Sequence, residues 1–458
     1  MTAAIALNRF GLGSRPDEGV PPDPKAWLLD QFRRFEMKPA AWRALPSSDE
    51  IARDLVDVRM EIREVGEAGK VTARKEMRQD HWEIYRQSVN ARMTSALVTA
   101  APFVERLVHF WANHFAVSTD KLVVIPFAGT FEMEAIRPHV LGRFEDMLLA
   151  VERHPAMQLY LDQTRSAGPA SALAMRAEIH GARRMPGLNE NLAREILELH
   201  TLGVRSGYSQ ADVTELARAL TGWTIAGLGR EGRGVGGEIG RFLFDPTLHE
   251  PGTRRILGKN YAQPGEAQAR AALLDFAIAP ATATHIATKL ARHFVSDDPP
   301  PALIGRLANV FVRSGGDLTT LYRELVAAPE CWTSAVPKFK SPWEWLISVM
   351  RGTGMRDLGQ MQGAPILQQL GQPVWRPGSP AGFDDVAARW AAPDALVRRV
   401  EVAERFATRI SDDVDPRTLA DRLLPGAVSS ATRTAIARAD SPATGLALLL
   451  VSPEFLRR

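Results

Sequence analysis

Apolar side chains recur three or four positions apart along most of this 458-residue chain, a spacing that predicts a protein built mainly from α-helices. The spacing is clearest in Phe103–Phe115, where large aromatic and aliphatic side chains share a helical face. Residues 50–97 are rich in Arg, Glu and Lys with few apolar positions, so we expect one or two long, largely solvated helices there. Further helices are expected from Pro24 onward and at 144–151, 154–161, 190–202, 209–220, 264–278, 281–294, 299–313, 317–327 and 342–352, with short helices in 394–458.

Four segments are punctuated by glycine and proline and are expected to be irregular. They are an N-terminal arm over 1–23, a loop over 164–187, a glycine-rich stretch over 226–244 and a Pro-rich stretch over 372–382. The glycine-rich stretch holds seven glycines in nineteen residues and ends in Phe-Leu-Phe, which favours a small hairpin or a mobile flap. The predicted fold class is therefore mainly α, a multi-helical array with a small Gly-rich hairpin or flap insertion.

The length of the chain exceeds that of one ordinary hydrophobic core, so we expect two or three lobes, with a single large helical array as the alternative. The patterning divides the chain into three regions. Residues 1–100 hold the arm and the solvated helices, residues 101–262 form a central helical region with the flap, and residues 263–458 form a C-terminal helical region.

Composition narrows the classes of function. The chain has 56 Lys and Arg against 53 Asp and Glu, interleaved rather than gathered in a stripe, which disfavours nucleic acid as a partner. Cys331 is the only cysteine, so no intrachain disulfide and no cluster of thiolate metal ligands can form. We expect no transmembrane segment, because no run approaches the roughly 18 apolar residues that span a bilayer. The first residues lack a basic stretch followed by a long apolar run, so no cleavable signal peptide is expected.

The densest group of chemically active side chains lies within residues 189–223. On the helix expected there, Asn191, Glu195 and Glu198 are spaced i, i+4 and i+7 and so share a face. Two carboxylates one turn apart suit general acid–base catalysis or ligation of a divalent metal ion, and Glu195 and Glu198 are predicted to be catalytic. The alternative is structural, with Glu198 paired to Arg194 at i,i+4 and Glu195 bridging to a neighbouring helix.

Two histidines are candidate ligands of that metal ion, His114 and His200. His200 lies two residues beyond Glu198, roughly 200° around the helix, so one ion is not easily held by both side chains. His114 follows His109 and Asn113 in an aromatic stretch, where a hydrogen-bonded core histidine is the alternative to a base or a metal ligand.

Further residues complete the predicted site. Arg218 and Trp223 are predicted to bind substrate together with Asn191 and Asp162, because a ring beside an arginine and two acids is typical of a saccharide-binding surface. Asp162 could instead bind a cation, orient a histidine or make an ordinary loop hydrogen bond. Trp223, in a Thr-Gly-Trp that ends a helix, could instead fill the core. His249 lies beside the glycine-rich stretch and is the third predicted catalytic residue, for proton transfer, with a solvated bystander as the alternative.

Several of these segments resemble the signature of a bacterial protein family, the domain-of-unknown-function family eighteen-hundred. The strongest block is Asn189–Gly203, with the sequence NENLAREILELHTLG. The other similar blocks are Tyr208–Val213, Ala217–Trp223, His109–Phe115, Pro280–Ala283, Lys289–Val295 and Leu370–Gln372 with its Pro-rich sequel. The blocks follow one another in order over nearly the whole chain.

The resemblance implies a bacterial protein from a family without an assigned activity. Members of that family often carry an export signal, and they are commonly encoded beside a second family that bears a twin-arginine signal and resembles sulfatase-like hydrolases. Because this chain shows no such signal, we expect it either to stay in the cytoplasm or to reach the periplasm folded, carried by that partner.

Two hypotheses of function follow from the sequence. The first is a hydrolase-like or glycan-processing enzyme that works with the co-encoded sulfatase-like partner on a saccharide, with Glu195, Glu198 and His249 at its centre. The second is a non-enzymatic helical scaffold or chaperone for the exported partner, since the chain has no Gly-x-Ser-x-Gly elbow, no His-Glu-x-x-His and no P-loop.

Overall fold

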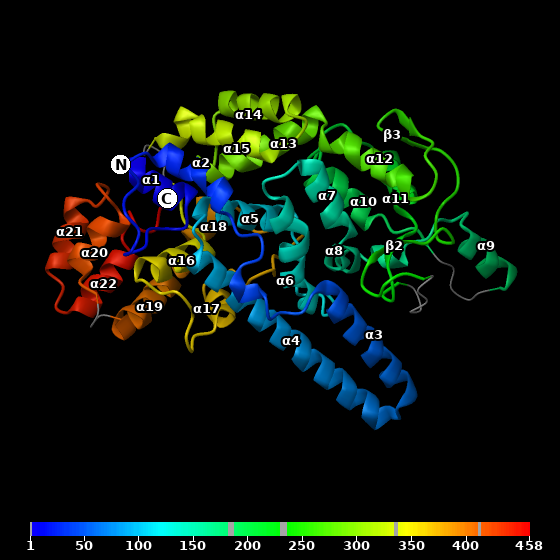
Figure 1. Ribbon diagram of the computed structural model, residues 1–458, viewed down its shortest axis with the longest axis horizontal. Coiled ribbons are helices and arrows are strands. Elements are labelled where there is room, and N and C mark those ends of the chain that lie inside the picture. The colour runs from blue at the N-terminus through cyan, green and yellow to red at the C-terminus, as the bar shows by residue number, and fades with distance from the viewer. Residues whose placement is uncertain (1, 182–186, 230–235, 334–337, 411–413) are drawn as a thin grey trace.

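The computed structural model describes residues 2–181, 187–229, 236–333, 338–410 and 414–458. Helices make up most of it and strands form only two small hairpins, which confirms the mainly-α class (Figure 1). The α-helices up to the first strand are α1 Thr2–Ile5, α2 Pro24–Arg34, α3 Ser48–Glu64, α4 Glu67–Val98, α5 Pro102–His114, α6 Ala128–Phe131, α7 Phe144–Arg153, α8 Pro155–Tyr160, α9 Ala172–Ile179, α10 Asn191–Glu195 and α11 Gln210–Leu220.

The second half of the chain is helical after the hairpins, as the apolar spacing predicts. Its α-helices are α12 Glu266–Ala277, α13 Pro280–Phe294, α14 Pro301–Arg313, α15 Leu318–Ala327, α16 Pro342–Gly352, α17 Gly363–Gln369, α18 Ala387–Trp390, α19 Pro393–Ile410, α20 Pro416–Leu423, α21 Ser430–Ala437 and α22 Pro442–Leu450. Short 3-10 helices lie at η2 Ala40–Trp42, η3 Ile125–Phe127, η5 Arg137–His139, η6 Gln163–Arg165 and η9 Pro329–Trp332.

Helix α5 illustrates how the sequence forms the core. Pro102 occupies its first turn, where the missing N–H leaves no intrahelical bond unmade. Phe103 and Trp111 are fully buried, and burial of each such side chain contributes about 1.5–3 kcal/mol. The indole Nε1 of Trp111 donates to the hydroxyl of Tyr322 on α15 at 2.6 Å, so its polar atom is satisfied inside the core.

Two hydrophobic clusters make up the interior of the described part of the chain. The first surrounds α5, α7 and α13–α15, and the second surrounds the C-terminal half of α4 with α16, α19 and α22. Leu12 and Trp42 extend the second cluster, so the first 100 residues contribute to both. The division into regions 1–100, 101–262 and 263–458 stays a prediction.

Within the described residues three π-helices interrupt the α-helical pattern: η1 Ala6–Phe10, η4 Glu132–Ile136 and η7 Ile196–His200. Such turns hold one extra residue and recur at functional sites. Here each one carries a buried polar residue, respectively Arg9, Glu132 and His200.

The N-terminal residues differ from the irregular arm that their glycines and prolines predict. Residues 2–10 form α1 and η1, and Phe10 is fully buried against Phe103 and Phe294. The helical segment is too short to show a clear period in the sequence, and it is held by tertiary packing rather than by propensity. The loop expected at 164–187 likewise contains the helix α9, and part of it, 182–186, lies outside the described residues.

The expected hairpin at the glycine-rich stretch is present. Strand β1 Trp223–Ile225 pairs antiparallel with β2 Phe242–Phe244, and residues 230–235 between them lie outside the described part of the chain. Trp223 therefore belongs to a strand and not to the end of a helix. A second hairpin, β3 Arg254–Ile256 with β4 Lys259–Tyr261, has no clear signal in the sequence because each strand is only three residues long.

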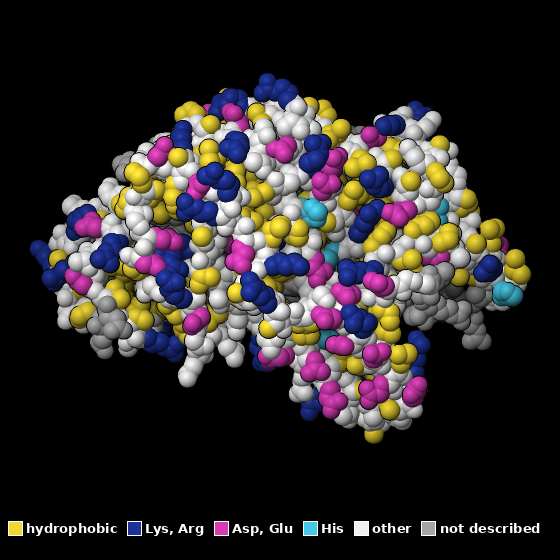
Figure 2. Space-filling view, in the orientation of Figure 1, with side chains coloured by type: hydrophobic (Ala, Val, Ile, Leu, Met, Phe, Trp, Pro, Cys, Tyr) yellow, Lys and Arg dark blue, Asp and Glu magenta, His cyan; other side chains and the backbone are white. Residues whose placement is uncertain are grey.

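The surface is charged and mixed. Figure 2 shows acidic and basic side chains interspersed over the visible face, including the α3–α4 hairpin that projects from the body in Figure 1. No single helix in the described part of the chain is long and apolar enough to cross a membrane, and α12 and α13 meet that test only as a pair bent by 59°.

Candidate functional site

The helix predicted at 190–202 begins as α10 and continues as the π-helix η7. Glu195 is half-buried, and burial raises the pKa of its carboxyl group, although His200 opposes that rise. Its carboxylate has no hydrogen bond or ion pair within the described residues. Glu198 lies 3.5 Å from Arg194, which is the structural pairing given as the alternative.

The two candidate metal ligands lie in the core. His200 is paired through Nδ1 with Glu152 Oε1 at 2.7 Å, and both side chains are buried. The Nε2 of His114 lies 3.1 Å from the backbone carbonyl oxygen of His200, and its Nδ1 is buried without a partner. Among the described residues no group of three or more His, Cys, Asp or Glu is arranged to hold a metal ion. The divalent metal ion stays a prediction.

The polar substrate-binding candidates are spread over the surface. Asp162 has the left-handed φ of 57° and pairs with Lys121 at 2.7 Å. Asn191 is exposed at the start of α10. Arg218 forms an ion pair with Glu215 one turn earlier on its own helix.

Trp223 and His249 are held by contacts with neighbouring residues of the fold. The ring of Trp223 is buried, with the guanidinium of Arg153 5.3 Å from its centroid. The Nδ1 of His249 lies 2.8 Å from the backbone carbonyl oxygen of Thr221, and the ring is half-buried.

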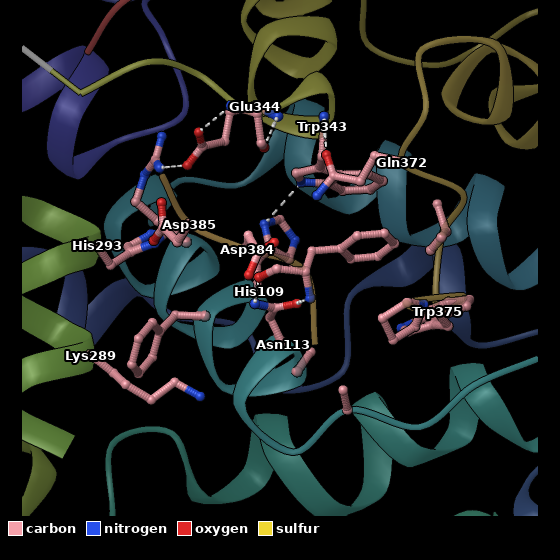
Figure 3. Close-up of a pocket in the computed structure, with 18 of the residues that line it drawn as sticks. His109, Asn113, Lys289, His293, Trp343, Glu344, Gln372, Trp375, Asp384 and Asp385 are labelled. Atoms are coloured by element: carbon pink, nitrogen blue, oxygen red, sulfur yellow. Dashed lines mark hydrogen bonds and ion pairs between the residues drawn. The ribbon is translucent and has the colours of Figure 1, made fainter. Parts of the chain in front are cut away.

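A cavity of about 220 Å³ lies elsewhere, where α5, α13, the start of α16 and the segment 372–385 meet (Figure 3). It is smaller than the roughly 300–1,000 Å³ of drug-sized sites, so it fits a small ligand. It lies between the two hydrophobic clusters, because α5 and α13 belong to the first and α16 to the second. None of the predicted site residues lines it. Its apolar wall includes the aromatic side chains Phe110, Trp343, Trp375, Phe383 and Trp390.

His293 on α13 and Asp385 form the most specific polar contact at this cavity. The Nδ1 of His293 lies 2.5 Å from Asp385 Oδ2, whereas its Nε2 is buried and has no hydrogen-bond partner among the described residues. Burial lowers the pKa of His293 and Asp385 only partly opposes it, so the ring is neutral at pH 7. A carboxylate on Nδ1 fixes the tautomer and orientation of the imidazole and leaves Nε2 as the proton acceptor.

The carboxylate of Asp385 is held by cations on its other side. Lys338 Nζ lies 3.2 Å and Arg458 Nη2 3.4 Å from Asp385 Oδ1. Burial alone would raise the pKa of Asp385, but His293, Arg458 and Lys338 outweigh it and hold the pKa well below its usual range. Asp385 is therefore ionised over the whole physiological range of pH.

Glu344 lies beside this group and joins two arginines. It forms ion pairs with Arg106 of α5 and with Arg458, whose Nε is 3.1 Å away. Both arginines are buried, and Glu344 itself is only 8% exposed. Burial would raise the pKa of Glu344, but Arg458 and Arg106 lower it to about 2. The ion pair between Arg106 and Glu344 joins α5 to α16 on the two sides of the cavity.

His109 forms one wall of the cavity through its ring. Its Nδ1 accepts the indole N–H of Trp343 at 3.2 Å, so the neutral ring carries its proton on Nε2, which faces Glu105 at 3.7 Å. Arg92 of α4 lies over the ring of Trp343 at 4.1 Å. The Nε2 of His109 is buried and has no hydrogen-bond partner among the described residues, so the hydrogen bond that this ring makes is the one that supports Trp343.

Lys289 lies one turn before His293 on α13 and lines the same cavity. Its ammonium group has no hydrogen bond or ion pair within the described residues. Burial lowers the pKa of Lys289 to about 8, with Asp385 opposing the shift and Arg292 adding to it. In Figure 3 its side chain lies on the opposite side of the cavity from Trp343.

A side-chain clamp holds the loop that carries Asp385. Asn113 accepts the backbone N–H of Phe383 on Oδ1 at 2.7 Å and donates through Nδ2 to the carbonyl of Phe383 at 2.9 Å. The preceding Gly382 has φ +83°, and a Cβ at this position would lie 2.2 Å from the backbone oxygen of Asn113. Only glycine permits this approach.

Replacing Gly382 by alanine should therefore displace the loop and lower the free energy of unfolding by about 1–3 kcal/mol. Gly378→Ala is the matched control, because a Cβ there has nothing within 4 Å. Thermal melting of both variants checks this. Equal melting temperatures for the two variants would show that the clamp does not hold the loop.

The comparisons with known proteins agree with the resemblance of the sequence blocks. The model of a protein family described as protein of unknown function, DUF1800, matches residues 5–457. The chain belongs to the DUF1800 family. No curated protein and no solved structure matches it.

Three of the blocks that resemble the DUF1800 signature meet at the cavity. They are His109–Phe115, Lys289–Val295 and Leu370–Gln372 with its Pro-rich sequel, and each contributes lining residues. Candidates chosen by local spacing omitted His293, Lys289, Glu344 and Asp385, although the first two lie at i and i+4 on a predicted helix. Lys289 and His293 lie in the block Lys289–Val295, which was the signal that could have found these two, whereas Glu344 and Asp385 lie in none of the blocks. The roles predicted for Glu195, Glu198 and His249 stay predictions.

Proposed function

We propose that this DUF1800 protein is a hydrolase-like enzyme whose active centre is the cavity between α5, α13, α16 and the segment 372–385. The observation that carries the proposal is the contact of 2.5 Å between His293 Nδ1 and Asp385, with Nε2 of the same ring unpartnered. In the proposed reaction Nε2 of His293 accepts the proton of the attacking water, and Asp385 stabilises the imidazolium that forms.

The tryptophan rings that line the cavity favour a substrate with a flat apolar face. Trp343 and Trp375 flank the guanidinium of Arg92, at 4.1 and 5.5 Å from their ring centroids. Trp375 also donates its indole N–H to Glu132 at 3.2 Å, so the ring is fixed before a ligand arrives. Rigid aromatic rings beside polar groups suit a sugar ring, which keeps a glycan-processing reaction as the proposed form of the hydrolase.

The rival function is a scaffold or chaperone for the sulfatase-like partner. It is favoured by the α3–α4 hairpin, which projects from the body in Figure 1 and exposes Met60 and Val71 by 49% and 66%. A helical arm of this kind could bind a partner without any catalysis. The partner, its export signal and a periplasmic location remain proposals that rest on the family resemblance.

A turnover screen distinguishes the two functions. Purified protein is incubated with 4-nitrophenyl esters, phosphates, sulfates and glycosides, and release of nitrophenol is followed between pH 5 and 9. We expect turnover of at least one class, with a rate that falls as the pH drops through the pKa of His293, below 6.5, because the protonated ring cannot accept a proton. Absence of turnover on every class would contradict the hydrolase and favour the scaffold.

A further inference from the structure

The cavity contains cationic side chains without an anionic partner. Lys289 forms no hydrogen bond or ion pair within the described residues, and it is half-buried. Arg292, three residues later on α13, uses only its Nε, which donates to the carbonyl of Asp297 at 3.2 Å. Its two terminal nitrogens have no partner within the same described residues. Both side chains line the cavity.

The acidic groups near these cations are largely committed elsewhere. Asp385 is shared among His293, Lys338 and Arg458. Glu344 is taken by Arg106 and Arg458. Asp384 lines the cavity but is exposed to solvent. An uncompensated ammonium group at a partly buried wall is costly, and an anion that enters the cavity would remove that cost.

We propose that Lys289 and Arg292 bind an oxyanion carried by the substrate, a carboxylate, sulfate or phosphate group. The inference deepens the proposed function, since it assumes that the cavity is the substrate site. Figure 3 shows Lys289 on the far side of the cavity from Trp343 and Gln372. A ligand can therefore place a ring against the tryptophan wall and its charged group against α13. The substrate class is an acidic or esterified sugar-like compound.

The charge of Lys289 sets the pH dependence of this binding. Besides Arg292, the titratable groups that interact with it are His285 of its own helix, His114 of α5 and Asp385 of the facing loop, and His293 and Asp384 line the same cavity. Burial lowers the pKa of the three histidines, so each is neutral at pH 7 to 9. Asp385 stays ionised over the same range. Loss of the proton of Lys289 near pH 8 is then the change that weakens binding of an anion.

The test uses sodium acetate, sodium sulfate and sodium phosphate as probes, titrated into the whole protein by calorimetry at constant ionic strength with sodium chloride. We expect saturable binding of at least one probe at pH 7, about tenfold weaker in Lys289→Met. Above pH 8 the affinity of the wild type should fall toward that of the variant, by about tenfold in all, whereas loss of the Lys289 proton cannot affect the variant. Lys121→Met is the matched control, because Lys121 lies outside the cavity and pairs with Asp162.

Which of the three probes binds shows the kind of oxyanion. Equal affinities of the wild type and Lys289→Met, or no saturable binding of any probe, would overturn the proposal. The melting temperature of Lys289→Met without probes shows that the variant folds, and we expect it to be no lower than that of the wild type. If probes bind through Lys289 but the turnover screen stays silent, the oxyanion site stands and the hydrolase does not.

Discussion

Replacing Glu344 by glutamine should lower the free energy of unfolding by about 3–5 kcal/mol, the usual cost of removing one partner from a buried ion pair. Glu344 holds Arg106 and Arg458, and these two guanidinium groups are 1% and 0% exposed. The neutral amide would leave both positive charges buried, with Asp385 as the remaining nearby anion, which forms an ion pair with Arg458. The loss should appear in urea unfolding curves at pH 7.

The pH dependence of the free energy of unfolding tests the role of Glu344 a second time. Because the pKa of Glu344 is lowered to about 2, its stabilising contribution is fully present above pH 4.5 and is lost as the pH falls toward 2. The difference in free energy of unfolding between the wild type and Glu344→Gln should therefore shrink as the pH falls toward 2. Glu330→Gln is the control, since Glu330 pairs with the exposed Arg306 and such pairs contribute about 0–1 kcal/mol. Equal losses of unfolding free energy in Glu344→Gln and Glu330→Gln would show that the buried ion pairs of Glu344 do not stabilise the fold around the cavity.

Replacing His293 by glutamine should reduce turnover of the substrate found in the screen by at least about 100-fold. Glutamine can still donate an N–H to Asp385, so the loop keeps its anchor, but the amide cannot accept a proton from water. The melting temperature should therefore change far less than the rate. Initial rates and melting curves of the same preparation check both parts.

His249→Gln is the matched control for this loss. His249 is the loop histidine predicted from the sequence to transfer a proton, and it does not line the cavity. We expect its substitution to leave the rate within about threefold of the wild type. If His249→Gln lost activity and His293→Gln kept it, the active centre would lie at the helix and hairpin of residues 189–250 and not at the cavity.

The helices could be predicted because their signals are local. Ser209 and Asp212 form a capping box at the start of α11, and Gly203, with φ +92°, follows the helix predicted at 190–202. Prolines mark the first turns of α5 and α13 in the same way. Each signal lies within a few residues of the helix end that it sets, so one sequence is enough to find it.

The cavity could not be predicted because its contacts join distant parts of the chain. His293 and Asp385 are 92 positions apart, and Arg106 and Glu344 are 238 apart. Asp385 lies in a segment that lacks helical spacing, where sequence patterns give no direction for a side chain. Conversely, the group of Glu and His side chains in residues 189–203 can be recognised from the local sequence. Its histidine, His200, is however held in the core by Glu152.

The proposed function requires the substrate to bind in the cavity between α5, α13, α16 and the segment 372–385. A crystal structure of the protein soaked with the product of the best nitrophenyl substrate tests it most directly. We expect product density inside the cavity, with its ring against Trp343 or Trp375 and a polar atom within hydrogen-bond distance of His293 Nε2. Density along Asn191, Glu195 and Trp223 instead, with the cavity free of product, would contradict it.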